Sequence, residues 1–177
     1  AGRSRDCGID RSMIIGYGQD DRVCAFTSLF AILDVEEVDR TACCILVDKE
    51  EIGSVGATGM HSRFFENVIA EMVALQGSES ELKVRRTLAN SRMLSSDVSA
   101  AYDPMFAEAF EKRSSAFFGK GLVFNKFTGS RGKGGSNDAN AEYLAQIRHA
   151  MDEKQVAYQY AELGKVDVGG GGTIAYI

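Results

Sequence analysis

Short apolar runs alternate along this chain with segments whose apolar residues recur every three or four positions, and this alternation constrains the fold most strongly. The run "CCILV" at 43–47 has the length of a buried strand. Phe26, Phe30 and Leu33 instead lie on one face of a predicted helix. Strands that alternate with helices are typical of layered α/β folds, in which helices cover a sheet. We therefore expect a three-layer α/β/α sandwich with a mixed, largely parallel sheet.

The chain is expected to form a single domain over residues 1–177, because it contains no linker-like stretch and no repeat with a period of roughly 20 to 50 residues. The strand at 41–48 has the continuous apolar character of a strand buried on both faces. We predict strands at 12–18, 41–48, 92–104, 121–127 and 156–163, and helices at 20–34, 61–77, 81–91 and 139–151.

Composition narrows the classes of partner. The net charge of −5 does not favour general binding to nucleic acid. No run approaches the roughly 20 apolar residues that a membrane helix needs, so we expect no membrane partner. The four cysteines contain no C-x-x-C pair, and we interpret them as reduced thiols of a cytoplasmic protein.

Acidic residues follow three of the predicted strands. Asp20 comes after the first strand, Glu50 and Glu51 come after the second, and Asp97 lies near the end of a later one. The carboxyl ends of parallel strands meet at one edge of a sheet, where sites of open α/β folds are found. Four carboxylates gathered there would repel one another unless a cation were present. The pattern therefore favours one or two divalent metal ions, with a carboxylate shared between them.

Each of these residues also has an ordinary alternative role. Asp20 could cap the helix that follows it. Glu50 and Glu51 could be solvated surface residues, and Asp97 could serve a turn or a cap. Their shared position after apolar strands is what favours a common site.

Three motifs carry a resemblance to a known family. The stretches "YGQDDRVCAFTSL" and "CCILVDKEEIGSVGATG" are followed, in order, by "MLSSDVSAAYDP". Together they resemble the aspartyl aminopeptidase family of zinc metallopeptidases, in its bacterial form, over nearly all of the chain. The resemblance implies a hydrolase that removes the N-terminal residue of peptides with a free N-terminus.

The resemblance also implies a site with two divalent metal ions, zinc in the first place, with cobalt or manganese as alternatives. Asp20 matches the aspartate that bridges both ions. Glu51 matches a ligand of one ion and Asp97 a ligand of the other. Glu50 matches the catalytic base, and Asp21 matches a position beside the bridging aspartate that supports the ligands.

The division of roles between the two glutamates has a physical basis if the chain is extended there. Adjacent residues of an extended chain point in opposite directions. Glu51 could then bind a metal ion while Glu50 faces the attacking water and accepts its proton.

The family pattern contains parts that residues 1–177 lack. It supplies two histidine ligands and an inserted dimerisation domain, and neither His61 nor His149 matches a ligand position. We therefore expect this chain to be an incomplete part of a catalytic domain that is inactive by itself. The family forms large homo-oligomers, commonly of twelve subunits, so the resemblance implies the same assembly.

Two further features bear on the substrate. Gly171, Gly172 and Thr173 lie in the turn "GGGGT", which the resemblance places beside the substrate. Asn125 lies near the position where members that prefer acidic first residues carry lysine, so we expect a neutral or broad preference. Two rival interpretations stay open: a scaffold or interaction domain that keeps the fold without metals, and an anion- or nucleotide-binding domain that uses the glycine turn.

Overall fold

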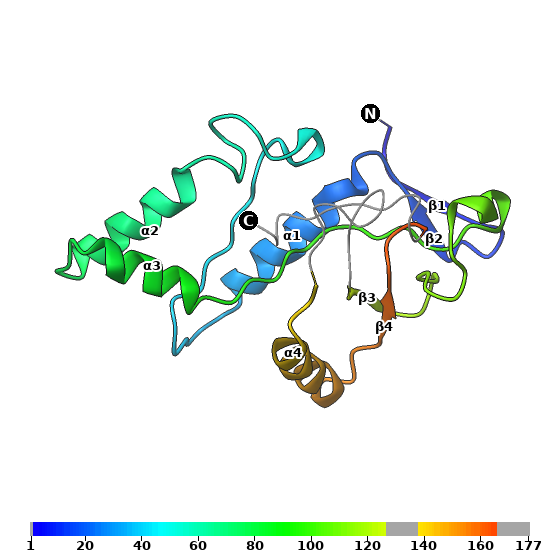
Figure 1. The fold of residues 1–177 in the computed structure, drawn as a ribbon. Helices are drawn as coiled ribbons and strands as arrows, with labels where there is room; N and C mark the ends of the chain where they lie inside the picture. Colours follow the sequence, from blue (N-terminus) through cyan, green and yellow to red (C-terminus); the bar gives the residue numbers. More distant parts are fainter. Residues whose placement is uncertain (1, 127–137, 166–177) are drawn as a thin grey trace. The chain divides into compact units, whose positions relative to one another are not determined.

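The structure is a computed structural model, and it describes residues 2–126 and 138–165 (Figure 1). Helices and short strands follow one another along the chain, as expected for the α/β class. The elements are β1 (Arg5–Cys7), β2 (Met13–Ile15), α1 (Gln19–Leu33), the 3-10 helix η1 (Glu50–Ile52), α2 (Phe64–Leu75), α3 (Glu81–Ala89), the 3-10 helix η2 (Pro104–Ala109), β3 (Leu122–Asn125), α4 (Ala141–Glu153) and β4 (Tyr158–Ala161).

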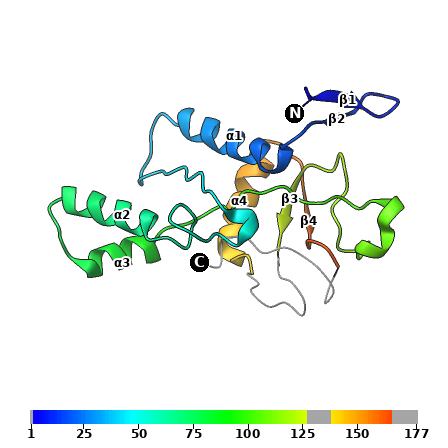
Figure 2. The same ribbon diagram turned by 90° about the horizontal axis from the view of Figure 1, so that it is seen from above.

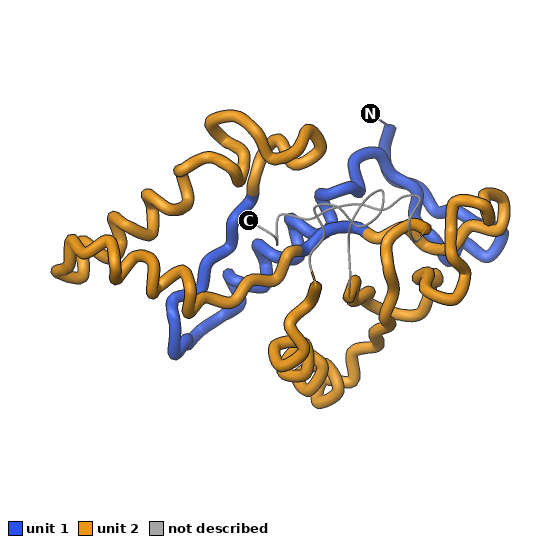
Figure 3. Tube along the Cα trace, in the orientation of Figure 1, with its two compact units in different colours: residues 1–46, 96–98 blue, residues 47–95, 99–177 orange. Residues whose placement is uncertain are grey.

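The chain divides into two compact units (Figure 3). Unit 1 consists of residues 1–46 and 96–98, and unit 2 of residues 47–95 and 99–177. The short segment 96–98 therefore joins the N-terminal part of the chain from a distant point in the sequence. The structure thus has two compact units, and the single domain expected over residues 1–177 stays a prediction.

Unit 1 begins with an antiparallel hairpin. Arg5 of β1 lies opposite Ile15 of β2, and Cys7 lies opposite Met13. β2 confirms the strand expected at 12–18. β1 was not predicted, because its polar residues show none of the apolar alternation that marks a half-buried strand.

α1 confirms the helix expected at 20–34. Its apolar residues recur at helical spacing, and the ring centroids of Phe26 and Phe30, one turn apart, are 4.4 Å from each other. The stripe is largely open to solvent, since Phe26 is 61% exposed and Leu33 is 67% exposed.

The structure has no strand at 41–48, so the strand predicted there is wrong. The backbone at 41–47 belongs to no strand, and Ile45 and Leu46 are exposed rather than buried on both faces. A strand needs a neighbour for its backbone hydrogen bonds. Among the described residues β1 pairs only with β2 and β3 only with β4, so 41–47 has no partner strand.

The strand expected at 92–104 is also wrong for most of its length. Within it, the described backbone pairs only through an isolated parallel bridge between Ala101 and Ala116. The N–H of Tyr102 donates a hydrogen bond of 2.8 Å to the carbonyl of Ala116. The chain then turns at Asp103, whose carboxylate accepts a bond of 2.8 Å from the N–H of Met105 at the start of η2.

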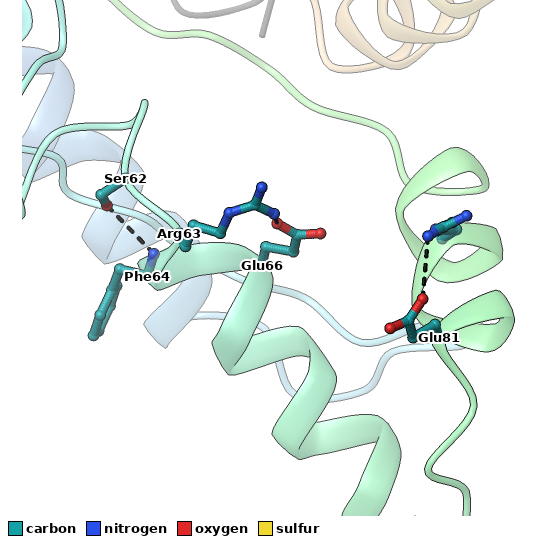
Figure 4. A network of polar contacts seen from close by, with 6 residues as sticks. Ser62, Arg63, Phe64, Glu66 and Glu81 are labelled. Atoms are coloured by element: carbon teal, nitrogen blue, oxygen red, sulfur yellow. Dashed lines mark hydrogen bonds and ion pairs between the residues drawn. The ribbon is translucent and has the colours of Figure 1, made fainter.

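In unit 2, α2 and α3 form a helical hairpin and lie side by side in both ribbon views (Figures 1 and 2). Both helices were predicted, and Val73 of α2 is buried at 8% exposure. Polar contacts mark the first turn of each helix (Figure 4). Arg63 pairs with Glu66 at 2.7 Å, and Glu81 pairs with Arg85 at 3.1 Å.

Among the described residues of unit 2, one sheet pairs β3 with β4 in parallel, with Leu122 opposite Tyr158 and Asn125 opposite Ala161. Both strands and the helix α4 were predicted. Asn140 caps α4, since its side-chain oxygen accepts a bond of 2.8 Å from the N–H of Tyr143. The small residues Ala116 and Ala161 are the most deeply buried apolar residues described, at 2% and 4% exposure.

Gln159 of β4 joins this sheet to the turn that precedes β3. Its amide nitrogen donates to the carbonyls of Phe117 and Gly121, at 3.0 and 3.2 Å, and its oxygen accepts from the N–H of Phe117 at 2.9 Å. One side chain thus satisfies both the donor and the acceptor of Phe117.

Among the helices of the described ranges, none combines the length and the apolar character required to span a membrane.

Candidate metal centre

Asp20 and Asp21 lie at the beginning of α1, where the sequence placed them, but outside regular helical geometry. Their backbone angles are φ −85°, ψ 110° and φ −118°, ψ 32°. The N-cap residue is Gly18, with φ 71°, and no side chain caps the helix there. The alternative role of Asp20 as the N-cap is therefore not what the structure has.

Asp97 lies in the segment 96–98 of the same unit and completes a cluster with the two aspartates of α1. One carboxylate oxygen from each of Asp20, Asp21 and Asp97 lies within 4.8 Å of the others, and all three residues are exposed. We call these three residues the aspartate cluster. Asp97 also accepts a hydrogen bond of 2.7 Å from the N–H of Val98.

The aspartate cluster has the donor chemistry of a divalent-cation site. Carboxylates bind zinc at about 2.1 Å, so two oxygens on one ion lie up to roughly 4 Å apart. Atoms gathered within 4.8 Å of one another need only small movements to reach that spacing. Carboxylates at such separations repel one another in the absence of a cation, which gives the cluster an electrostatic preference for positive charge.

Cys24 borders the aspartate cluster and was not among the predicted site residues. Burial, together with the nearby carboxylate of Asp21, raises the pKa of the Cys24 thiol to about 11. The available sequence signal was its spacing, since Cys24 follows Asp21 by one helical turn.

Glu50 and Glu51 lie in unit 2, in the 3-10 helix η1. The helix begins after Lys49, which has φ 66°, and ends at Gly53, which has φ 93° and whose N–H donates 2.9 Å to the carbonyl of Glu50. The expectation of an extended chain is therefore wrong here. Successive side chains of a 3-10 helix are about 120° apart rather than opposite, so the two carboxylates diverge by less than predicted.

The loop after η1 is closed by backbone contacts at Ser54 and Gly59. Ser54 is buried, has φ 58°, and accepts a bond of 3.0 Å at its carbonyl from the N–H of His61. A Cβ atom on Gly59 would lie 2.3 Å from that carbonyl oxygen, so only glycine fits. Across the loop, the hydroxyl of Thr58 donates a bond of 3.1 Å to Asp48.

The structure gives few contacts for the remaining residues that the sequence analysis named. Gly171, Gly172 and Thr173 lie outside the described residues. Asn125 ends β3, and its side-chain oxygen is buried without a hydrogen-bond partner among the described atoms. His149 lies on the exposed side of α4, 3.5 Å from Glu153, as expected for a surface residue.

The structure thus brings Asp20, Asp21 and Asp97 together within unit 1. Glu50 and Glu51 lie in unit 2, and their place beside the aspartate cluster stays a prediction. The roles of all five residues also stay predictions.

Comparison with known proteins assigns the family. The family model described as aminopeptidase I zinc metalloprotease (M18) matches residues 1–177. A protein named probable M18 family aminopeptidase 1 from Clostridium acetobutylicum is 61% identical over the whole chain, which spans 38% of that relative's length. The protein of the same name from Thermotoga maritima is 43% identical over 97% of the chain, which again spans 38% of the relative.

Solved structures give the same result. The crystal structure of aminopeptidase I from C. acetobutylicum matches 99% of the chain with a TM-score of 0.85 and 59% identity, over 37% of that structure's chain. The crystal structure of the M18 aminopeptidase from T. maritima matches 97% of the chain with a TM-score of 0.89, over 38% of its own. The chain therefore belongs to the M18 family of aminopeptidase I zinc metalloproteases.

Proposed function

We propose that residues 1–177 are part of the catalytic domain of a two-metal aminopeptidase, which removes the N-terminal residue of peptides with a free N-terminus. The observation that carries the proposal is the aspartate cluster, in a chain of the M18 family. Two of its members, Asp20 and Asp97, are residues that the sequence motifs had singled out as metal ligands.

We assign Asp20 to the bridging position between two zinc ions, with cobalt or manganese as alternatives. Glu51 would bind one ion and Asp97 the other, and Asp21 would support the ligands. When bound, such a pair lowers the pKa of water and polarises a carbonyl group. The high charge density of the aspartate cluster is consistent with these assignments.

Glu50 is our candidate for the general base. Its carboxylate would accept the proton of the attacking water and pass it to the amine that leaves, a transfer worth about 10²–10⁴ in rate in enzymes generally. The 3-10 helix supports a difference in role, since it turns the side chain of Glu51 about 120° away from that of Glu50. Gly171, Gly172 and Thr173 would contact the substrate backbone.

The proposal includes the rest of the molecule. In this account the domain is a three-layer sandwich completed by chain beyond residues 1–177, which also supplies two histidine ligands and the dimerisation domain. The apolar segment 41–47, in which Ile45 and Leu46 are exposed in this structure, would then be covered by further chain. The complete protein would form a large homo-oligomer in the cytoplasm, commonly of twelve subunits in the family. Residues 1–177 by themselves would be inactive.

The experiment compares the complete native protein that carries residues 1–177 in metal-free and zinc-loaded form. Hydrolysis is measured on a peptide with a free N-terminus and on the same peptide with an acetylated N-terminus. We expect hydrolysis only with zinc and only of the free peptide. Failure to bind any divalent metal would favour the scaffold interpretation, and nucleotide binding without metal would favour the anion-binding one.

A further inference from the structure

The residue before Glu50 has a backbone conformation that depends on its surroundings. Lys49 has φ 66° and ψ 19°, in the left-handed region that residues with a side chain rarely adopt. Such a conformation is strained and persists only where neighbouring contacts fix it. Because Lys49 is the N-cap of η1, its backbone angles set the direction in which Glu50 leaves the chain.

Asp48 and Ser54 supply contacts of this kind to the backbone of Lys49. The carboxylate of Asp48 accepts a hydrogen bond of 2.8 Å from the N–H of Lys49. The carbonyl of Lys49 accepts a bond of 2.7 Å from the N–H of Ser54. Both backbone polar groups of Lys49 are therefore bonded. Asp48 also pairs with the Lys49 ammonium at 2.7 Å, but this ion pair is exposed and contributes little by itself.

Thr58 holds the carboxylate of Asp48 from the far side of the loop. Its hydroxyl donates a bond of 3.1 Å to Asp48, ten residues earlier in the chain. The bond is charge-assisted, because its acceptor is a carboxylate. Thr58 is followed by Gly59, whose backbone lies against the carbonyls of Ser54 and Val55 and leaves no room for a side chain. The hydroxyl therefore projects from a part of the loop that is itself fixed.

We propose that Thr58 is a positioning residue of the reaction, whose hydroxyl holds Asp48 and, through the backbone of Lys49, the place of the Glu50 side chain. The inference rests on the proposed function, because that function makes Glu50 the base. Thr58 acts here on the geometry of η1 and needs no contact with metal or substrate. A reacting group displaced by about 1 Å can lose roughly 10² in rate, so a contact of this kind affects kcat.

The first measurement is hydrogen–deuterium exchange of the segment 50–61 in the metal-free complete protein, followed by mass spectrometry. The second is kcat, KM and zinc content of the zinc-loaded complete protein on a peptide with a free N-terminus. The variants are Thr58→Val, which removes the hydroxyl at nearly constant size, and Thr58→Ser, which keeps it. Thr87→Val is the matched control, because it removes a hydroxyl that bonds only within α3.

We expect Thr58→Val to speed exchange of the segment 50–61 by roughly two- to tenfold, the effect of losing one hydrogen bond. Its kcat should fall about tenfold, while KM and zinc content keep their native values. Thr58→Ser and Thr87→Val should behave as the native protein does. Thr58→Val should cause no further loss when it is added to Asp48→Ala, since the hydroxyl acts through that carboxylate.

Native exchange and native kcat in Thr58→Val would overturn the inference and leave the proposed function intact. Faster exchange with native kcat would overturn it too, because the loop would then not control the base. A loss in Thr58→Ser as large as that in Thr58→Val, or additive losses in Asp48→Ala/Thr58→Val, would exclude the proposed hydrogen bond as the cause. A zinc-loaded native protein that hydrolyses no peptide would overturn the proposed function together with the inference.

Discussion

The carbonyl oxygen of Ser54 accepts a hydrogen bond of 3.0 Å from the N–H of His61, and this contact closes the loop that follows Glu50 and Glu51. The same oxygen lies 2.3 Å from where a Cβ atom on Gly59 would be. The geometry of the loop therefore depends on one position that has no room for any side chain.

Gly59→Ala tests this dependence. We expect the free energy of unfolding to fall by about 1–3 kcal/mol, because the new methyl group meets backbone atoms that can move only if the loop opens. Urea unfolding measures the change. Gly2→Ala is the control, since nothing lies within 4 Å of that position and the change should stay below about 0.5 kcal/mol. Equal stability of the two variants would show that the loop is not closed as described.

Gln159 gives a second stability test, away from the metal centre. Gln159→Ala removes three hydrogen bonds to Phe117 and Gly121. Each such bond contributes about 0.5–1.5 kcal/mol, so we expect a loss of roughly 1–3 kcal/mol in urea unfolding. The exposed residue Gln76 offers a matched control, and Gln76→Ala should change stability by less than about 0.5 kcal/mol. If Gln159→Ala and Gln76→Ala have the same free energy of unfolding, Gln159 does not stabilise the turn before β3.

Asp10 gives a prediction of how the stability of the fold depends on pH. The hydroxyl and the N–H of Ser12 donate to its carboxylate at 2.8 and 3.2 Å, and the hydroxyl bond is the main cause that lowers the pKa of Asp10 from its ordinary value. A lowered pKa means that the folded state favours the ionised carboxylate. The contribution to stability is therefore present above the pKa of the unfolded chain and is lost as the pH falls through the folded pKa.

The titration of Asp10 can be followed by NMR of its carboxyl carbon. Ser12→Ala should raise the pKa towards the ordinary value of an aspartate, while Ser12→Thr, which keeps the hydroxyl, should leave the pKa low. An unchanged pKa in Ser12→Ala would mean that the hydroxyl bond is not its cause.

Helices were predictable from the sequence because their signal is local. The stripe that contains Phe26 and Phe30 repeats with the period of a helix, and a helix makes its backbone hydrogen bonds within its own segment. The same holds for α2, α3 and α4. Strand pairing is not local, which is why the apolar run at 41–47 looked like a strand and yet has no neighbouring strand among the described residues.

The candidate site shows the same contrast. The pattern of acidic residues led to Asp20 and Asp97, which the structure brings together. The apolar run at 43–47 did not predict the 3-10 geometry of Glu50 and Glu51. That geometry depends on the positive φ angles of the flanking residues Lys49 and Gly53.

Metal stoichiometry distinguishes the roles proposed for two members of the aspartate cluster. Asp20→Asn should lose both ions, because the bridging carboxylate binds each of them, whereas Asp97→Asn should lose only one. The metal content of the purified complete protein, determined by mass spectrometry, measures the difference. Asp34→Asn, at the C-terminal end of α1, should retain the native content. Identical losses in the two cluster variants would contradict the bridging role of Asp20.

The most direct measurement of the central claim is the hydrolysis of an N-terminally free peptide by Glu50→Gln in the zinc-loaded complete protein. This variant keeps the size of the side chain but cannot accept a proton. The account predicts that kcat falls by about 10²–10⁴ while the zinc content stays at the native value. Native hydrolysis by Glu50→Gln with native zinc content would contradict the assignment of Glu50 as the base and with it the proposed mechanism.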